Sequence, residues 1–326
     1  MALGVFKKLL QQKLITEREF ENIELHENAI SVFVELRSLL YLGIALFSTA
    51  IGVLIYKHIE TIGHDVLVIS IVLVCVACFG YCILKAKGYS NEKISSPSFL
   101  FDYILFLGCL LLLTFIGYIQ FQYNIFGNRW GLAAFIPMLL LFISAYYFDH
   151  IGVLSLAITN LAAWVGINAT PTRLLKENDF NSDRTIYAAI LLGISLLSIS
   201  FFSTSKNVKA HFSFTYKNFA AHILFVALLA GLFHFHPVYL GWFLMLALFS
   251  FFAFRSAIRD RSFYFLVITA LYGWIGLSYV VVQLLTGINA DMGSIYLVFF
   301  YFIFSGIAFI RLLIHYNKVL KQHANL

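Results

Sequence analysis

Charged side chains are scarce in this sequence. Asp, Glu, Lys and Arg together make up 12% of the 326 residues, whereas a soluble protein carries about 25%. Hydrophobic residues make up 61% of the chain, and its mean hydropathy is +0.88. These values exclude an ordinary soluble domain and indicate that lipid surrounds most of the chain.

Long apolar runs dominate what is present. A membrane-spanning helix needs about 20 mostly apolar residues, because hydrocarbon offers the backbone no partner outside the helix. The runs are Leu39–Tyr56, Val66–Leu84, Phe99–Phe121, Gly131–Tyr147, Ile151–Ile167, Ile186–Phe202, Phe219–Phe235, Val238–Phe254, Phe263–Leu285 and Ser294–Ile314. We therefore expect an all-α polytopic bundle of about ten transmembrane spans over residues 37–326, preceded by a short cytoplasmic helical hairpin at residues 1–36.

Lysine and arginine are distributed unevenly over the loops that ten spans would create. Most of the 22 lie in the set of loops that includes both termini. The other set of loops holds Lys57, Arg129, Arg173, Lys176 and Arg184. The positive-inside rule then places both termini in the cytoplasm. The net charge of +6 is explained by this topology, so no nucleic-acid partner is expected.

Catalytic motifs are missing as well. The sequence contains no glycine-rich phosphate loop, HExxH motif, nucleophile elbow or desaturase-like histidine box. Its predicted spans also lack the central carboxylate that proton-coupled transporters usually carry, because Asp102, Asp149 (beside His150) and Asp291 fall at span ends or in loops. We predict no catalytic residue, metal or cofactor. Enzymatic activity is left open, although the missing motifs argue against it.

A few polar residues do lie deep in the predicted spans. Asn160 is expected to form an interhelical hydrogen bond, and His222 and Gln283 are the other residues that could line a polar cavity. The longest outward loop, residues 168–185, is a candidate docking loop because loops on a rigid bundle often carry function. Its basic residues are Arg173, Lys176 and Arg184.

Two further groups of residues, one of cysteines and one of histidines, contain side chains that can bind a metal. Cys75, Cys78 and Cys82 share one helix face, with Cys109 at a similar depth in the next span, but cysteine in apolar helices usually behaves as a small hydrophobe. His234 and His236 could share a metal, although two ligands do not make a site. Small residues four apart, Ser48/Gly52 and Ala189/Gly193, predict close helix crossings.

The opening segment is the most soluble-looking part of the chain. Thr16 and Glu19 fit a capping box that starts a helix. The apolar face of the hairpin is expected to pack against protein, since its second helix is too acidic for an anionic membrane surface. The residues predicted to bind a partner are Leu9, Leu10, Phe20 and Ile23.

The stretch "LLQQKLITEREFENI", followed by "LRSLLYLGIALFSTAIGVLIYKHIETIGHDVLV", resembles the start of the DUF2157 family of predicted bacterial membrane proteins. Its hairpin also resembles the SHOCT-type helical module, an oligomerisation element. Lys13 and Leu14 stand where the family usually carries a turn glycine. The resemblance covers roughly the first ninety residues and implies a multi-pass protein of the bacterial inner membrane, without implying an activity.

Three functions fit these observations. The first is a scaffold or accessory subunit that binds another membrane or envelope protein, or a second copy of this chain, in contact with membrane lipids. The second is a transporter of a hydrophobic or weakly polar solute. The third is an intramembrane enzyme on a lipid-linked substrate, with the loop at residues 168–185 at its entrance.

Overall fold

The computed structural model describes Thr16 and residues 33–57, 63–98, 100–169, 182–288 and 292–322. The chain divides into two units, residues 1–58 with 321–326 and residues 59–320, and each is described by itself. The helix of the first unit is α3 (Phe33–Lys57). The predicted hairpin lies outside the described residues, apart from Thr16 and the start of α3, so the boundary at residue 36 stays a prediction.

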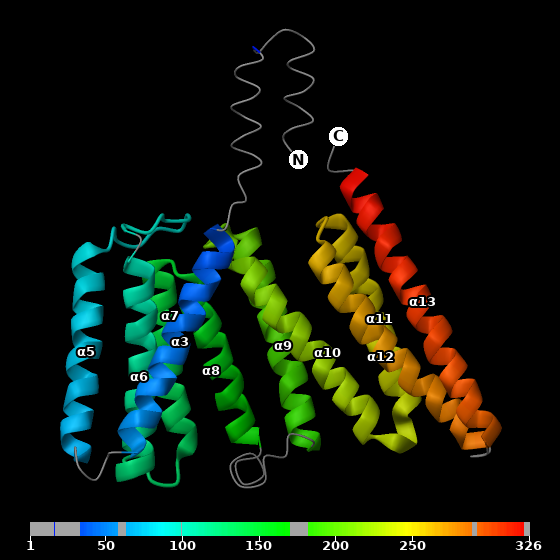
Figure 1. Ribbon diagram of the computed structural model, residues 1–326, viewed down its shortest axis with the longest axis horizontal. Helices are drawn as coiled ribbons and strands as arrows, with labels where there is room; N and C mark the ends of the chain where they lie inside the picture. The colour runs from blue at the N-terminus through cyan, green and yellow to red at the C-terminus, as the bar shows by residue number, and fades with distance from the viewer. Residues whose placement is uncertain are drawn as a thin grey trace. The chain divides into compact units, whose positions relative to one another are not determined.

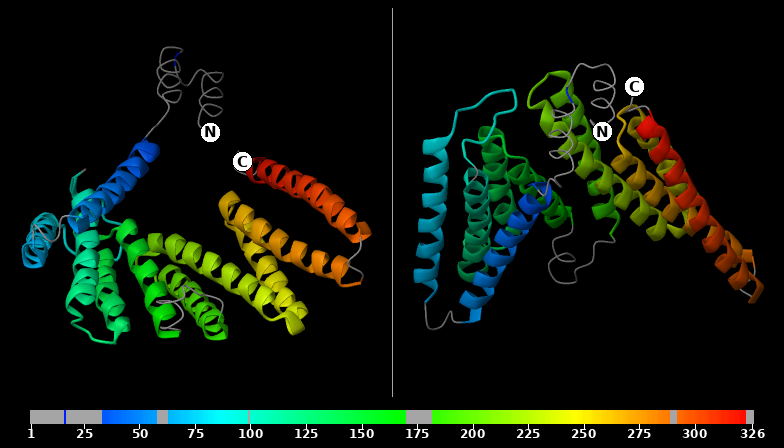
Figure 2. Two further views of the ribbon diagram at one scale, coloured as in Figure 1. Left: turned by 60° about the horizontal axis from the view of Figure 1, so that its bottom comes forward. Right: turned by 45° about the horizontal axis from the view of Figure 1, so that its top comes forward.

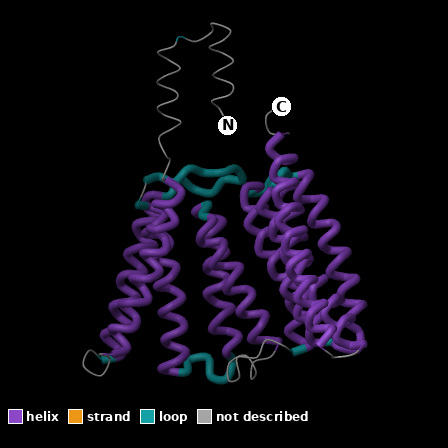
Figure 3. The backbone as a smooth tube through the Cα atoms, turned by 45° about the vertical axis from the view of Figure 1, so that its right-hand side comes forward, coloured by secondary structure: helices purple, strands orange, loops and turns teal. Residues whose placement is uncertain are grey.

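Long helices form the second unit (Figure 1). They are α5 (His64–Lys85), α6 (Phe101–Tyr123), α7 (Trp130–Phe148), α8 (Ile151–Ala169), α9 (Asp183–Ser205), α10 (Ser213–His234), α11 (Tyr239–Arg259), α12 (Phe263–Ile288) and α13 (Met292–Gln322), with the short 3-10 helices η2 (Ala210–Phe212) and η3 (His236–Val238). The described residues contain no strand (Figure 3). The predicted all-α polytopic bundle is confirmed.

Nine helices among the described residues are long and apolar enough to cross a membrane. They correspond to the second to tenth predicted runs. The first predicted run falls in α3, whose apolar part, Ser38–Leu54, is shorter than the 18 residues of the other spans' apolar windows. That span therefore stays a prediction, and α13 runs past its predicted end at Ile314 to Gln322.

Successive helices of the second unit alternate in direction, so their connections gather at two ends (Figure 3). We call the end with residues 86–98, 149–150, 206–212 and 260–262 the inner end, and the end with residues 124–129 and 235–238 the outer end. Among the described residues of this unit, Arg129 and Arg184 are the only Lys or Arg at the outer end. This distribution agrees with the predicted orientation, which itself stays a prediction.

Helix α10 is central to the packing of the second unit. One face, with Tyr216 and Ala220, joins an apolar cluster with α5 to α9, and the other, with Phe225 and Leu232, joins a second cluster with α11 and α12. The helix lies beside α9 in every view (Figures 1 and 2). The predicted close crossing at Gly193 is confirmed, because a Cβ added there would lie 2.5 Å from Leu224 Cγ on α10.

Candidate functional site

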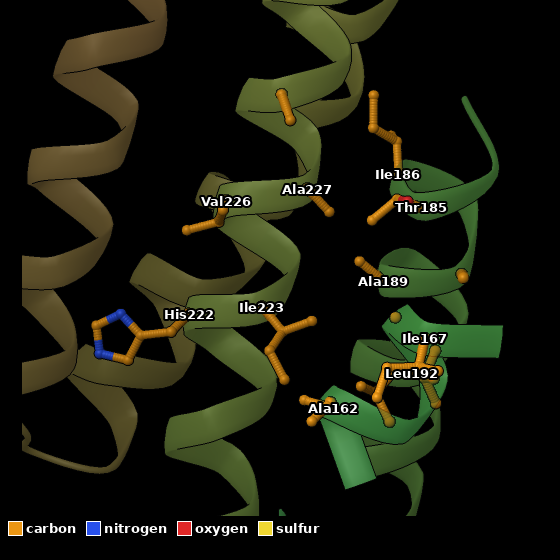
Figure 4. Close-up of a pocket in the computed structure, with 15 residues that line it drawn as sticks. Ala162, Ile167, Thr185, Ile186, Ala189, Leu192, His222, Ile223, Val226 and Ala227 are labelled. Atoms are coloured by element: carbon orange, nitrogen blue, oxygen red, sulfur yellow. The ribbon is translucent and has the colours of Figure 1, made fainter. Parts of the chain in front are cut away.

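A half-open hollow of about 830 Å³ lies between α8, α9 and α10 (Figure 4). We call it the outer groove, because it starts within a turn of the outer ends of α8 and α9. Its walls are apolar except for Thr185 and His222. The lining residues are Ala162, Ala163, Val165, Gly166, Ile167, Thr185, Ile186, Ala188, Ala189, Leu192, His222, Ile223, Val226, Ala227 and Ala230.

Small side chains create the outer groove. Alanine or glycine recurs on all three walls, as at Gly166 on α8, Ala189 on α9 and Ala227 on α10. Such residues normally allow helices to approach closely, as α9 and α10 do at Gly193. Along the groove no larger side chain from the described residues fills the space that the small residues leave, so the result is a hollow rather than a helix contact.

His222 borders this groove but does not point into it. Its imidazole is directed towards a neighbouring helix and away from Ala162 and Leu192 (Figure 4). On that side Nδ1 lies 3.0 Å from Tyr272 Oη, and Nε2 lies 3.2 Å from Tyr264 Oη, both on α12. The interior of the outer groove is therefore almost wholly hydrocarbon.

A second hollow, of about 470 Å³, lies at the outer ends of α7 and α8. We call it the outer polar hollow, because its walls combine polar groups with two tryptophans. It shares one lining residue, Ile167, with the outer groove. Its lining residues are Asn128, Arg129, Trp130, Gly131, Leu132, Phe135, Trp164, Ile167 and Asn168.

The three residues predicted for a polar cavity are not brought together. Asn160 Nδ2 donates to Ala134 O on α7 at 2.7 Å, which confirms the predicted interhelical hydrogen bond. His222 bonds to α12, as above, and Gln283 is half-buried on α12. Neither Asn160 nor Gln283 lines either of the two outer hollows.

The predicted docking residues are only partly described. Arg184 is exposed in the first turn of α9 and lines neither hollow. Arg173 and Lys176 lie outside the described residues, as do Leu9, Leu10, Phe20 and Ile23 of the hairpin. Their roles stay predictions.

The cysteines and the outer histidines take separate places. Cys75, Cys78, Cys82 and Cys109 are all buried and unbridged between α5 and α6, on the shared face that their spacing predicts. The two outer histidines diverge: His234 pairs with Asp183 at 2.7 Å, whereas His236 lies 3.1 Å from Tyr279 Oη. Within the described part of the chain, no three His, Cys, Asp or Glu residues are placed to hold a metal.

The inner end holds a buried ionic cluster that sequence reasoning missed. Asp149 follows α7 in the left-handed conformation (φ 58°), which its short polar side chain tolerates. Oδ1 of its carboxylate lies 3.0 Å from Lys209 Nζ and 2.6 Å from His211 Nε2, and Oδ2 accepts from Ile94 N at 2.5 Å. The side chains of Asp149 and Lys209 are fully buried.

This cluster fastens the connection at residues 86–98, which we call the inner strap. The backbone N–H of Lys209 donates to Asn91 O at 2.9 Å, and Ser96 Oγ donates to Asp102 Oδ1 at 2.5 Å. Lys209 Nζ contacts Asp149 as an ion pair by distance but makes no directed hydrogen bond to the described residues. Its charge faces the Asp149 carboxylate and the Tyr89 ring of the inner strap, whose centroid is 5.3 Å from Nζ, and these contacts make the cluster a structural anchor.

A more exposed ion pair joins α10 to the connection between α11 and α12. Lys217 contacts Asp260, which also accepts from Ser256 Oγ at 3.2 Å and from Arg259 Nε at 3.5 Å. Burial raises the pKa of the Asp260 carboxyl. The hydrogen bond and charge of Lys217, together with the other two donors, outweigh burial and hold that pKa below its usual 3.8.

A comparison with known protein families supports the resemblance that the opening segment suggested. Residues 7–154 match the DUF2157 family, described as "Predicted membrane protein". The DUF2157 match thus covers the predicted hairpin from residue 7 onward and continues through α7 into the start of α8, beyond the roughly ninety residues that the motif indicated. Comparisons with curated proteins and with solved structures find no match.

The DUF2157 match and the two outer hollows coincide only in part. Arg129, Trp130 and Phe135 of the polar hollow lie inside the matched residues, whereas every lining residue of the outer groove follows residue 154. The family description therefore supports a membrane protein, and the groove has to be interpreted from its own chemistry.

Proposed function

We propose that this membrane protein binds the hydrocarbon chain of an amphiphile, a lipid or a lipid-linked molecule, in the outer groove. The observation that carries the proposal is the apolar hollow of about 830 Å³ between α8, α9 and α10. Its volume falls within the range of about 300–1,000 Å³ that ligand sites occupy. The groove lies within helices long and apolar enough to span a membrane, so acyl chains are the surrounding medium.

The chemistry of the walls selects the occupant. An ionised or strongly polar solute would lose its hydration there and gain almost no hydrogen bonds, which costs several kcal/mol per group. A hydrocarbon chain loses nothing of this kind, and it gains close contacts with the Ala and Gly walls that bulkier neighbours would prevent. The groove therefore favours a lipid-like ligand over a weakly polar solute.

The test fills the groove without adding charge. Ala189→Phe places a ring in the hollow, since Ala189 lines it (Figure 4). Ala247→Phe is the matched control, because Ala247 is exposed on α11 and lines neither hollow. We expect mass spectrometry of protein purified in mild detergent to show less co-purified lipid for Ala189→Phe alone. Equal lipid retention in both variants would refute the proposal.

A second candidate function, the scaffold or accessory subunit, is favoured by the sequence of the predicted leading hairpin. The DUF2157 match begins at residue 7 and so includes most of this segment. Its apolar positions Leu9, Leu10, Phe20 and Ile23 would bind a membrane or envelope protein, or a second copy of the chain. Deleting residues 1–36 should then release a stoichiometric partner, and a partner that persists after the deletion would contradict this role.

The distribution of Lys and Arg supports a proposal for the cellular location. An inner bacterial membrane with both termini in the cytoplasm agrees with the scarcity of Lys and Arg at the outer end. Green fluorescent protein folds to its fluorescent form in the cytoplasm, so a fusion of it after Leu326 should fluoresce. A fusion that instead activates periplasmic alkaline phosphatase would reverse the orientation.

A further inference from the structure

The outer polar hollow has the composition of a headgroup site. Trp130 and Trp164 form part of its wall, and tryptophan is enriched at the level of lipid headgroups. Trp164 packs against Phe135 with ring centroids 5.3 Å apart, which fixes the wall shared by α7 and α8. The hollow thus combines aromatic and polar groups at the outer end of the spans.

The charge of this hollow is positive. Arg129 lines it and is exposed, and its guanidinium has no ion pair or hydrogen bond to the described part of the chain. None of the described residues that line the hollow is acidic. Arg129 is also the N-cap of α7, where no side chain caps the first turn, so the positive end of the helix dipole adds to the guanidinium.

The donor groups suit a phosphate. A guanidinium offers five N–H donors in a planar fork that matches phosphate oxygens, and the Asn128 amide supplies further donors beside it. Asn168 approaches closely from α8 because residue 131 is glycine: a Cβ there would lie 3.0 Å from Asn168 Oδ1. Its Nδ2 donates to Trp164 O at 2.8 Å, which fixes the orientation of the amide.

The two hollows are arranged as a head and a tail site. Both are lined by Ile167, two residues before the outer end of α8. We infer that Arg129, with Asn128 and the tryptophans, binds the anionic phosphate headgroup of the amphiphile whose chain occupies the outer groove. This inference rests on the proposed function and adds a preference for anionic over zwitterionic lipids.

The test uses two photoreactive, clickable lipid probes with identical chains, one with a phosphatidylglycerol headgroup and one with a phosphatidylcholine headgroup, on the full-length protein in nanodiscs. Wild-type protein should label more strongly with the anionic probe, by about tenfold, the equivalent of one hydrogen bond to a charged group. Arg129→Gln should remove this preference while total labelling by the choline probe persists. Arg184→Gln is the matched control, because Arg184 is exposed at the same end but lines neither hollow.

The outcomes separate the headgroup inference from the groove. A preference that survives Arg129→Gln, or that Arg184→Gln removes equally, overturns the inference and leaves chain binding intact. If neither probe labels the groove walls, the proposed function fails and the inference fails with it.

Discussion

Asp149→Asn tests the buried ionic cluster most sharply. The substitution keeps the size of the side chain and an oxygen for the Ile94 N–H, and replaces the charged oxygen that faces Lys209 and His211 with a neutral NH2 group. Lys209 is fully buried and its Nζ has no directed hydrogen bond among the described residues, so the Tyr89 ring, whose centroid lies 5.3 Å from Nζ, would be left facing the charge without an anion. An ammonium without an anionic partner would remain in the interior.

The expected loss of stability follows from that burial. Removing one partner of a buried ion pair costs about 3–5 kcal/mol, because the other charge stays desolvated. Asp260→Asn is the matched control at the same end, since the Asp260 side chain is 38% exposed, and exposed pairs contribute about 0–1 kcal/mol. Asp149→Asn should therefore lower the free energy of unfolding several times more than Asp260→Asn does.

A double variant separates charge from packing. Lys209→Met removes the ammonium at similar volume, so Asp149→Asn with Lys209→Met should recover most of the stability that Asp149→Asn alone loses. Unfolding by heat or by sodium dodecyl sulfate, in one detergent for all variants, measures the difference. Failure of the double variant to recover would show that the cost came from lost shape rather than from lost charge.

The inner strap supplies a local readout for the same variant. Lys93 is exposed next to Ile94, whose backbone N–H donates to Asp149. Weaker anchoring should speed tryptic cleavage after Lys93 in Asp149→Asn and leave Asp260→Asn like the wild type. Equal stability of the two variants, together with unchanged cleavage, would refute the assignment of the cluster as the anchor.

Two further predictions concern the ion pair of Asp260 and the packing of α10. The folded-state pKa of Asp260 is lowered, so the contribution of its carboxylate to stability is present above the unfolded pKa near 3.8 and is lost as the pH falls below that value. The difference in melting temperature between the wild type and Asp260→Asn should therefore shrink as the pH falls from about 6 to about 3. A difference that grows over this range would contradict the pairing. Gly231→Ala should destabilise by about 1–3 kcal/mol, because its Cβ would lie 2.3 Å from Trp242 Cε3, whereas Gly117→Ala meets nothing within 4 Å and should be close to neutral in the same melting assay.

The spans could be predicted from the sequence because hydropathy is a local property. The hydropathy of a run such as Val66–Leu84 depends only on its own residues and not on the helices that pack against it. Helix α5 forms over nearly the same residues. The shared face of Cys75, Cys78 and Cys82 follows from helical spacing alone. Asn160 was also predictable, because a deep amide in a span requires a partner.

The two sites could not be predicted, because both depend on contacts between distant segments. Asp149 looked like a turn residue, and Lys209 like one more positive charge at the membrane edge. Nothing local shows that Ile94, Asp149, Lys209 and His211 meet. The groove was hidden for a related reason: Ala189 fits a close helix crossing as well as it fits a hollow, and only the positions of α8, α9 and α10 distinguish the two.

The most direct test of the central claim maps where a lipid chain contacts the protein. A photoreactive group near the end of the chain of a lipid probe, activated in nanodiscs and followed by peptide mass spectrometry, reports the helices that touch it. Chain binding in the outer groove predicts crosslinks concentrated on residues 162–167, 185–192 and 222–230, reduced by Ala189→Phe and unchanged by Ala247→Phe. Crosslinks spread evenly over the lipid-facing surfaces of α5, α11 and α13 would contradict it.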